Sequence, residues 1–558
     1  MVFSAEQNNR LQLYYSRIVA KSFYDEYLYY KIIDMKKSGL KRSVNWCFIL
    51  VGVFIFTIVS CSSSDEPDPV PSTEYKSILE LENAVDSLHI ELAIATRDNN
   101  FFAPAWGADD ITTSYYSSKA DYREIDQRLT SPYNERLVTI WKSSYKIIHS
   151  VNNIFFNAAN LEVSDMNKKD MLLGEAYFIR GFMYHYLTRV FGKVPLQLDP
   201  EPHIEFTLSE TVNIYKQIES DWLEAERMLP ESYPGVETGA PRPNNGTARA
   251  FLARLYLDWG GFPLEDASKY QEAASSAKKV MENHDSHGFD LMEDLDDLWT
   301  LEHRFNKESV FTIEHCVDCI QGGNRKMGKL GNPGELGGWE DTFSEIKFFE
   351  TFPENHRKNA TFITDPMIED PYTTPSGGPT VNWTAFIIQQ NPILAKITGK
   401  GDIPRSSFES DRNDYMMRYA EVLLIYAEAS ARAGNINQDA WEALNKIRRR
   451  AELLPPDTPN PDVDLSSGDL AELAFTERGW EFAGEFLRWF DLTRMERVDA
   501  VLRDAYRNDI SSTVSDPNHP DYGQPVVERV QIIGSTGKDN YFSPLPQRMI
   551  DEYPNLEN

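Results

Sequence analysis

RYAEVLLIYAEA, residues 418–429, lies at the centre of a predicted helix over residues 415–433. Alanines recur at alternate positions from Ala427 onward, and such small side chains let a neighbouring helix approach closely. Gly434 ends this helix, and the pattern of residues 438–451 predicts another helix directly after the turn. The segment therefore predicts two helices packed against each other.

A comparable pair of helices is predicted earlier in the chain, over residues 247–259 and 267–283, with a turn at residues 260–263. Both pairs resemble tetratricopeptide-type repeats, whose unit is about 34 residues long. Apolar residues at spacings of three and four predict further helices within residues 78–92, 141–154, 176–190, 214–229 and 470–495. The predicted fold class is therefore mainly α, a tetratricopeptide-like helix-pair scaffold with long irregular loops.

Stretches rich in Gly, Pro, Asn and Asp interrupt the helices at residues 98–135, 230–246, 315–345, 365–412 and 506–540. Irregular loops longer than about 12–15 residues are uncommon in compact domains and often carry function. A few short strands are predicted among them, such as residues 309–313 and 527–532. A functional site is therefore expected on the loops.

The composition narrows the classes of protein to consider. Of the 558 residues, 41% are apolar and 25% are charged, which is ordinary globular usage and disfavours wholesale disorder or a polytopic membrane protein. The formal net charge is −30, and so acidic a surface repels phosphate backbones, so no nucleic-acid partner is expected. With only four cysteines, no disulfide framework holds the fold.

The first sixty residues have the pattern of a targeting segment. Residues 1–34 show no such pattern themselves and are interpreted as an over-long N-terminal extension. Residues 35–60 form a predicted signal peptide, whose apolar run of about fourteen residues is shorter than the roughly 20 of a membrane-spanning helix. The run ends in IVSC at residues 58–61, which resembles a bacterial lipobox, so Cys61 is the predicted lipidation site and residues 61–74 the tether. A plain signal anchor, or an ordinary signal peptide with a chance cysteine, stays the alternative.

Six motifs, in order along the chain, resemble those of the SusD/RagB family of surface glycan-binding lipoproteins. They lie at residues 175–196, 247–257, 418–429, 445–451, 477–492 and 541–556. The most specific is RYAEVLLIYAEA, followed at the expected distance by NKIRRRA at residues 445–451. The resemblance covers residues 61–558, behind the lipobox, and none of the motifs names a ligand.

The resemblance implies a SusD-like fold, with an N-terminal helical region at residues 75–300 and a RagB/SusD region with ligand-binding loops at residues 301–558. It implies a surface-exposed lipoprotein, lipid-anchored in the outer membrane, that captures oligosaccharides or polysaccharides and delivers them to a SusC-like TonB-dependent transporter. It implies a scaffold role for the signature helices, and no catalytic residue, metal or cofactor. Two alternatives stay open, a family member that binds peptides or another nutrient, and a helical-repeat scaffold that binds only protein.

Glycan recognition requires flat aromatic faces and fixed hydrogen-bonding groups, and the long loops supply both. The stretch that corresponds to part of the family's glycan platform holds Asn100, Trp106, Asp109, Tyr115 and Tyr116. Two later loops hold Trp339, Asn382 and Trp383. These residues are the candidate ligand-binding set, with Trp106 and Trp339 first. For each aromatic residue, a hydrophobic anchor of its loop stays the alternative.

Two other constellations could carry chemistry. Cys316 and Cys319 follow His315, but a structural zinc site needs four ligands and no second pair lies nearby, so a local disulfide or two free thiols is expected. Glu421 and Glu428 lie on one predicted helix face, whereas a glycosidase places two carboxyls about 5–10 Å apart across a cleft. Structural carboxylates that accept hydrogen bonds from neighbouring helices would explain the pair equally well, so no enzyme is predicted.

Overall fold

The computed structural model describes residues 74–557, apart from residues 117, 201–205, 234–240, 327–330, 368–378 and 400–406. These residues belong to one compact unit, Thr73–Asn558. The predicted extension, signal peptide and most of the tether, with Cys61, lie outside the described residues. The division of the body near residue 300 stays a prediction.

Helices dominate the described residues. The longer ones are α3 (Ile78–Thr96), α5 (Glu135–Ala158), α6 (Met166–Phe191), α7 (Thr211–Met228), α8 (Asn245–Trp259), α9 (Lys269–Glu282), α14 (Tyr419–Arg432), α15 (Gln438–Ala451) and α16 (Leu470–Glu481). The shorter ones are α4 (Ala120–Asp126), α10 (His284–His287), α11 (Ile346–Thr351), α12 (His356–Thr361), α13 (Ala395–Thr398), α17 (Arg488–Arg494), α18 (Val498–Leu502), α19 (Asp504–Arg507) and α20 (Gln547–Glu552). Short 3-10 turns include η1 (Ala103–Gly107), η2 (Asp296–Trp299) and η5 (Trp383–Ala385).

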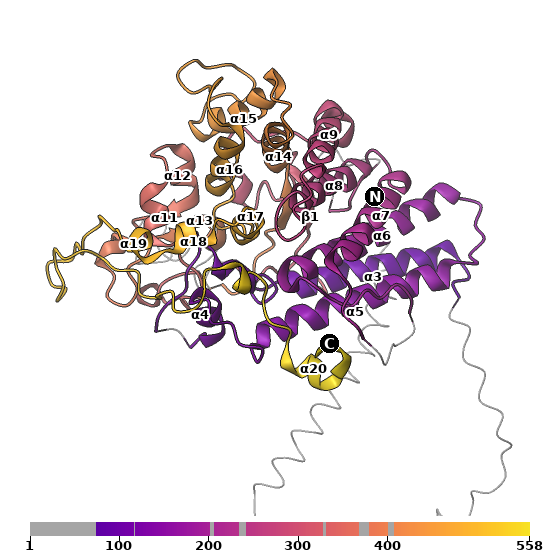
Figure 1. Cartoon of the computed structure of the whole chain (residues 1–558), viewed down its shortest axis with the longest axis horizontal. Helices are drawn as coiled ribbons and strands as arrows, with labels where there is room; N and C mark the ends of the chain where they lie inside the picture. The colour runs from indigo at the N-terminus through magenta and orange to yellow at the C-terminus, as the bar shows by residue number, and fades with distance from the viewer. Residues whose placement is uncertain are drawn as a thin grey trace, which may run out of the picture. The chain divides into compact units, whose positions relative to one another are not determined.

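Consecutive long helices pack on one another and build the scaffold. Helix α6 packs against α5 and α7, α8 against α7 and α9, and α14 against α9, α15 and α16. Figure 1 shows α14, α15 and α16 side by side in the orange part of the chain. One hydrophobic core runs from α3 to α17 through this stack. The predicted mainly α, helix-pair architecture is confirmed.

Local signals explain why the predicted helix pairs form. The Asn244 side chain accepts the Thr247 N–H (2.9 Å), and the Thr247 hydroxyl receives the Asn244 N–H, which is a capping box at the start of α8. Asn437 caps α15 in the same way by accepting from the Ala440 N–H (2.9 Å). Gly434 takes a positive φ of 76° between α14 and α15, a conformation that glycine adopts without strain.

Two predictions about strands have opposite outcomes. Residues 309–313 form strand β1 (Ser309–Ile313), as predicted, and β1 pairs antiparallel with β4 (Asp414–Arg418). Residues 415–418, the start of the predicted helix 415–433, are therefore strand, because β1 provides backbone hydrogen-bond partners for them. A second antiparallel pair joins β2 (Phe362–Ile363) to β3 (Ile393–Leu394). The predicted strand at 527–532 is wrong, since those residues form no ladder and reach the core only through single side chains such as Val530.

The predicted helix over residues 470–495 is broken into α16 and α17. Gly484 (φ +76°) and Phe486 (φ +63°) both adopt the left-handed region between the two helices. The break turns the Phe486 ring toward Phe102, on which it stacks with a centroid separation of 4.8 Å. Tertiary packing therefore overrides a helical pattern that is continuous in the sequence.

Buried ion pairs between the signature motifs hold the helices together. Arg254 Nε of α8 donates a hydrogen bond to Glu421 of α14 (2.8 Å). The Arg494 guanidinium of α17 donates to both carboxylate oxygens of Glu428 (2.7 Å each). Burial opposes ionisation of Glu421, but Arg254 and Arg478 hold the pKa of its carboxyl below the usual range. These contacts fit the scaffold role expected for the two glutamates, and neither carboxylate faces a cleft with the other.

Candidate functional site

In the candidate site, two loop segments that are far apart in the sequence form backbone hydrogen bonds with each other. Thr112 and Phe343 form an antiparallel bridge in which each backbone N–H donates to the other's carbonyl at 2.8 Å. The Ser114 N–H donates to the Glu340 carbonyl (3.2 Å). These backbone bonds hold the segment that carries Tyr115 and Tyr116 against the segment that carries Trp339. The fold therefore brings together aromatic residues that the sequence places in separate loops.

Three of these aromatic side chains are exposed. Tyr115, Tyr116 and Trp339, here called the aromatic patch, are 51%, 62% and 47% exposed. The two tyrosine rings meet edge to face with centroids 5.2 Å apart, and Trp339 meets Phe408 in the same manner at 5.0 Å. Exposed aromatic rings held next to one another are unusual on a surface and suit a ligand with flat apolar faces.

Buried carboxylates fix the backbone beneath the patch. Asp126 accepts from the Thr112 hydroxyl (2.7 Å) and the Thr113 N–H (3.2 Å). Glu340 accepts from the Ser114 hydroxyl (3.1 Å) and the Gly334 N–H (2.9 Å), and its own φ is +59°. A left-handed glutamate is a strained conformation that only firm surroundings maintain. The patch is therefore preorganised rather than carried by a free loop.

A second set of buried polar groups extends this support. The Tyr115 N–H donates to Gln389 Oε1 (3.3 Å), whose own amide donates to Asn391 Oδ1 (2.6 Å). Asn391 donates in turn to Glu528 Oε2 (3.0 Å). Burial raises the pKa of Asp126 to about 7 and that of Asp341 to about 6, the latter despite the nearby Lys119 ammonium. The site thus rests on a continuous polar network in the interior.

Trp106 lies in a different environment from the one predicted. Its side chain is 0% exposed, its Nε1 donates to the Asp341 carbonyl (3.1 Å), and its ring stacks on Tyr122 with centroids 4.3 Å apart. The structure fits the alternative of a hydrophobic anchor for Trp106, because η1 folds the ring inward against side chains from distant segments. The Phe486 ring also stacks on Trp106, with centroids 5.9 Å apart.

Trp106→Ala should therefore lower stability by about 3–5 kcal/mol, the cost of truncating a buried tryptophan. Trp339→Ala, which removes a half-exposed ring, should stay within about 0.5 kcal/mol of the parent. Denaturant unfolding of both variants measures the difference. A Trp106→Ala protein as stable as the parent would mean that this ring is not part of the core.

Four other nominated residues make specific contacts with neighbouring parts of the chain. Asp109 is buried and forms a two-point ion pair with Arg488 (2.7 and 3.0 Å), and Asn100 accepts a hydrogen bond from Arg136. Trp383 is buried in a small hydrophobic cluster with Phe343 and Phe386. Asn382 caps the turn η5 by accepting from the Thr384 N–H (3.0 Å) and donates to Asp365 (3.0 Å). Their contacts explain all four as structural residues, and their role in ligand binding stays a prediction.

Asn382 has one further feature. It lines a surface hollow together with Thr380, Phe386, Ile387, Ser515 and Asp516. A hollow with amide, hydroxyl and carboxylate groups can receive hydroxyl groups of a ligand. This keeps Asn382 as a reserve candidate, whereas the adjacent Trp383 ring points into the interior.

Three residues beside the patch were missed by the sequence reasoning: Lys119, Gln389 and Arg529. Lys119 Nζ lies 5.4 Å from the Trp339 ring centroid, and the Arg529 guanidinium lies 5.9 Å from the Tyr116 ring centroid. No local motif marks them, because each comes from a different irregular segment. Only the long-range bridge between residues 112 and 343 could have located them.

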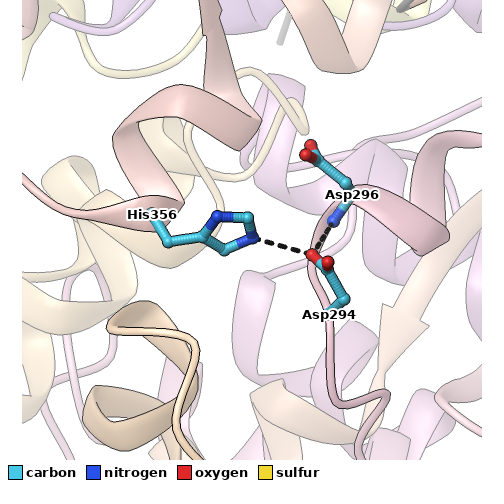
Figure 2. Close-up of side chains that lie close together, drawn as sticks. All are labelled: Asp294, Asp296 and His356. Atoms are coloured by element: carbon cyan, nitrogen blue, oxygen red, sulfur yellow. Dashed lines mark hydrogen bonds and ion pairs between the residues drawn. The ribbon is translucent and has the colours of Figure 1, made fainter.

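Two constellations outside the patch have structural explanations. Cys316 and Cys319 form a disulfide, one of the two expected states. Among the described residues, Asp294, Asp296 and His356 place one ligand atom each within 4.8 Å of the others. His356 Nε2 lies 2.7 Å from Asp294 Oδ1, and the same oxygen accepts the Asp296 N–H at 2.9 Å. Figure 2 shows the three side chains and these two contacts. These contacts link α12 to the loop before η2.

Comparison with known proteins defines the class. A protein-family model described as "SusD family" matches residues 366–558. A second family model, described as "Starch-binding associating with outer membrane", matches residues 65–257. The SusD-like protein P2 of Formosa agariphila is 25% identical over 494 residues, covering 81% of this chain and 90% of that protein. The chain belongs to the SusD/RagB family.

Solved structures share the fold. A laminarin-binding SusD-like protein superposes with a TM-score of 0.64 at 20% identity, covering 86% of this chain and 98% of that one. Surface glycan-binding protein A from Bacteroides fluxus superposes with a TM-score of 0.64 at 21% identity, covering 86% and 97%. Within the described residues, no helix has the length and apolarity to cross a membrane.

Proposed function

We propose that this protein is a non-catalytic glycan-binding lipoprotein of the outer-membrane surface. It captures oligosaccharides on the aromatic patch and delivers them to a partner TonB-dependent transporter. The observation that carries the proposal is the patch itself, with three exposed rings held on a polar network that fixes their backbone. The glycan-binding names of the two superposed structures and the outer-membrane description of the family model support it.

The chemistry of sugars explains why such a patch suits them. The C–H face of a pyranose ring packs on an aromatic ring, and its hydroxyls need hydrogen-bonding groups at the edge. Around the patch, the Lys119 ammonium and the Arg529 guanidinium lie beside the rings. Glu421 and Glu428, the paired carboxylates of the signature helix, are buried against arginines, which supports binding without catalysis.

The remaining parts of the role belong to the same proposal. Cys61 carries the lipid anchor, and several acyl chains on one cysteine hold a protein at a membrane more firmly than a single chain does. Residues 61–74 tether the body, and the patch joins loops of both predicted regions, with Tyr115 and Tyr116 in residues 75–300 and Trp339 in residues 301–558. A peptide-binding or purely protein-binding member of the family is the second candidate, because aromatic patches also serve proteins.

Affinity electrophoresis in gels that contain a panel of polysaccharides tests the proposal. The protein should be retarded by at least one polysaccharide, and Trp339→Ala should weaken that binding by about 1–3 kcal/mol, roughly ten- to hundred-fold. Phe156→Ala is the matched control, since it removes an exposed aromatic ring on α5, outside the patch.

Three results would redirect the assignment. Release of reducing sugar would identify an enzyme. Absence of retardation by every polysaccharide, together with a stable complex with a channel protein, would favour the peptide or scaffold candidates. Equal binding by Trp339→Ala and the parent would move the glycan site away from the patch.

A further inference from the structure

Three cationic side chains lie at the edge of the aromatic patch, although the chain carries a net charge of −30. Lys119, Arg123 and Arg529, here called the cationic rim, come from three positions around the tyrosines and Trp339. Lys119 Nζ lies 5.4 Å from the Trp339 ring, and Arg123 donates to the Ser114 carbonyl (3.4 Å). Positive charges gathered at one place on so acidic a protein call for a specific explanation.

Arg529 is the most informative member of the rim. Its guanidinium lies 5.9 Å from the Tyr116 ring centroid, and its Nε is buried without a hydrogen-bond acceptor. Within the described part of the chain, no carboxylate lies within the 4.0 Å ion-pair distance of this guanidinium. A buried donor that is left unsatisfied is costly, and the acidic chain offers many carboxylates that could have paired with it.

Two carboxylates near the patch lie beneath it, and one of them pairs with a member of the rim. Asp341 is buried and contacts Lys119 at 3.2 Å, and the buried Glu340 carboxylate is occupied by the Ser114 hydroxyl and the Gly334 N–H. Lys119 itself stays partly exposed. Asp341 therefore offsets the charge of Lys119 from below, whereas Arg529 has no such carboxylate among the described residues.

We propose that the glycan bound by the patch is anionic, bearing carboxylate or sulfate groups, and that Arg529 is the residue that recognises its charge. This inference rests on the proposed glycan-binding function. A guanidinium presents a planar fork of N–H donors that matches a carboxylate or sulfate, while the rings hold the sugar faces. The remaining acidic surface does not prevent approach, because exposed charges beyond about 8 Å are largely screened at physiological ionic strength.

Calorimetric titration with matched pairs of oligosaccharides tests this proposal. One set pairs oligouronates with the same chains after reduction of their carboxyl groups to alcohols. The other pairs sulfated oligosaccharides with their desulfated forms. At least one charged member should bind about tenfold more tightly than its neutral counterpart, as expected for one charge-assisted contact, and its affinity should fall as the NaCl concentration rises. The set that responds distinguishes a uronate from a sulfate.

Variants assign the effect to Arg529. Arg529→Gln should weaken binding of the charged oligosaccharide about tenfold and leave that of its neutral counterpart unchanged, while Arg529→Lys should restore part of the loss. Arg304→Gln is the matched control, because it removes an arginine that lies 5.2 Å from the ring of Phe305, outside the patch. Melting temperatures show that each variant is folded.

The possible outcomes separate this inference from the proposed function. One outcome is that the neutral and charged oligosaccharides of a pair bind with equal affinity and that binding depends on Trp339. That result would overturn the proposal of an anionic ligand and keep the glycan-binding function. Unchanged affinity of Arg529→Gln for the charged member would overturn the role of Arg529. If no oligosaccharide of either kind binds, both the function and the inference fail.

Discussion

Leu424→Asp should yield no soluble folded protein. Leu424 is completely buried in α14, where that helix packs against α9, α15 and α16. Losing the leucine side chain costs about 2–5 kcal/mol, and placing an unpaired carboxylate there adds several more. Together these terms approach the whole stability of a typical domain, about 5–15 kcal/mol.

Soluble yield, circular dichroism and thermal melting measure this effect. Ile436→Asp is the matched control, because Ile436 is exposed in the turn between α14 and α15 and should tolerate a charge. A Leu424→Asp protein that melts like the parent, and loses only ligand binding, would contradict the scaffold role of the signature helices.

Glu481→Gln should destabilise the protein by about 3–5 kcal/mol, the cost of breaking a fully buried ion pair. The completely buried Glu481 carboxylate accepts from Arg418 (3.0 Å), Arg450 (2.8 Å) and Arg357 (3.1 Å), which belong to three different segments. The neutral amide keeps the shape but leaves the arginines with one less counter-charge. Glu472→Gln, which disrupts a half-exposed pair with Arg497, should cost less than about 1 kcal/mol.

The pH dependence of this effect has a definite sign. Burial raises the pKa of Glu481, but the three arginines outweigh it and lower the pKa to about 2. The stabilisation is therefore complete above the unfolded value of about 4.3 and is lost as the pH falls through 2. Chemical denaturation at pH 7 and at pH 3 should show a smaller gap between Glu481→Gln and the parent at the lower pH. An equal gap at both values would argue against an ionised Glu481 in the fold.

The helix pairs could be predicted from the sequence because their signals are local. The capping residues Asn244 and Asn437 and the turn glycine Gly434 act within a few residues of the helix ends that they define. The break between α16 and α17 could not be predicted in the same way. It depends on the contact of Phe486 with Phe102, which lies almost four hundred positions earlier in the chain.

The candidate site was predictable only in part. An aromatic residue in an irregular loop has no periodicity that tells core from surface, so Trp106 and Trp339 had equal standing although one is buried and the other exposed. Their environments depend on contacts outside their own loops: the Trp106 ring stacks on Tyr122, and the Trp339 ring meets Phe408. Tyr115 and Tyr116 could be nominated from the sequence as aromatic residues of a loop, but the bridge between Thr112 and Phe343, which joins their segment to that of Trp339, could not.

Arg529 shows the limit of motif reasoning most clearly. Its own segment forms no helix or strand, and nothing within that segment indicates a ligand. Its significance comes from the Tyr116 ring beside it and from the lack of an acidic partner among the described residues, and both are properties of the folded chain.

The most direct test is a calorimetric titration of the parent and of Tyr116→Ala/Trp339→Ala with the best glycan of the panel. The double variant removes two exposed rings and should melt within a few degrees of the parent, since neither ring is in the core. It should lose about hundredfold or more in affinity, as expected for two stacking faces of about 1–3 kcal/mol each. A double variant that binds the glycan as tightly as the parent would contradict the assignment of the aromatic patch as the binding site.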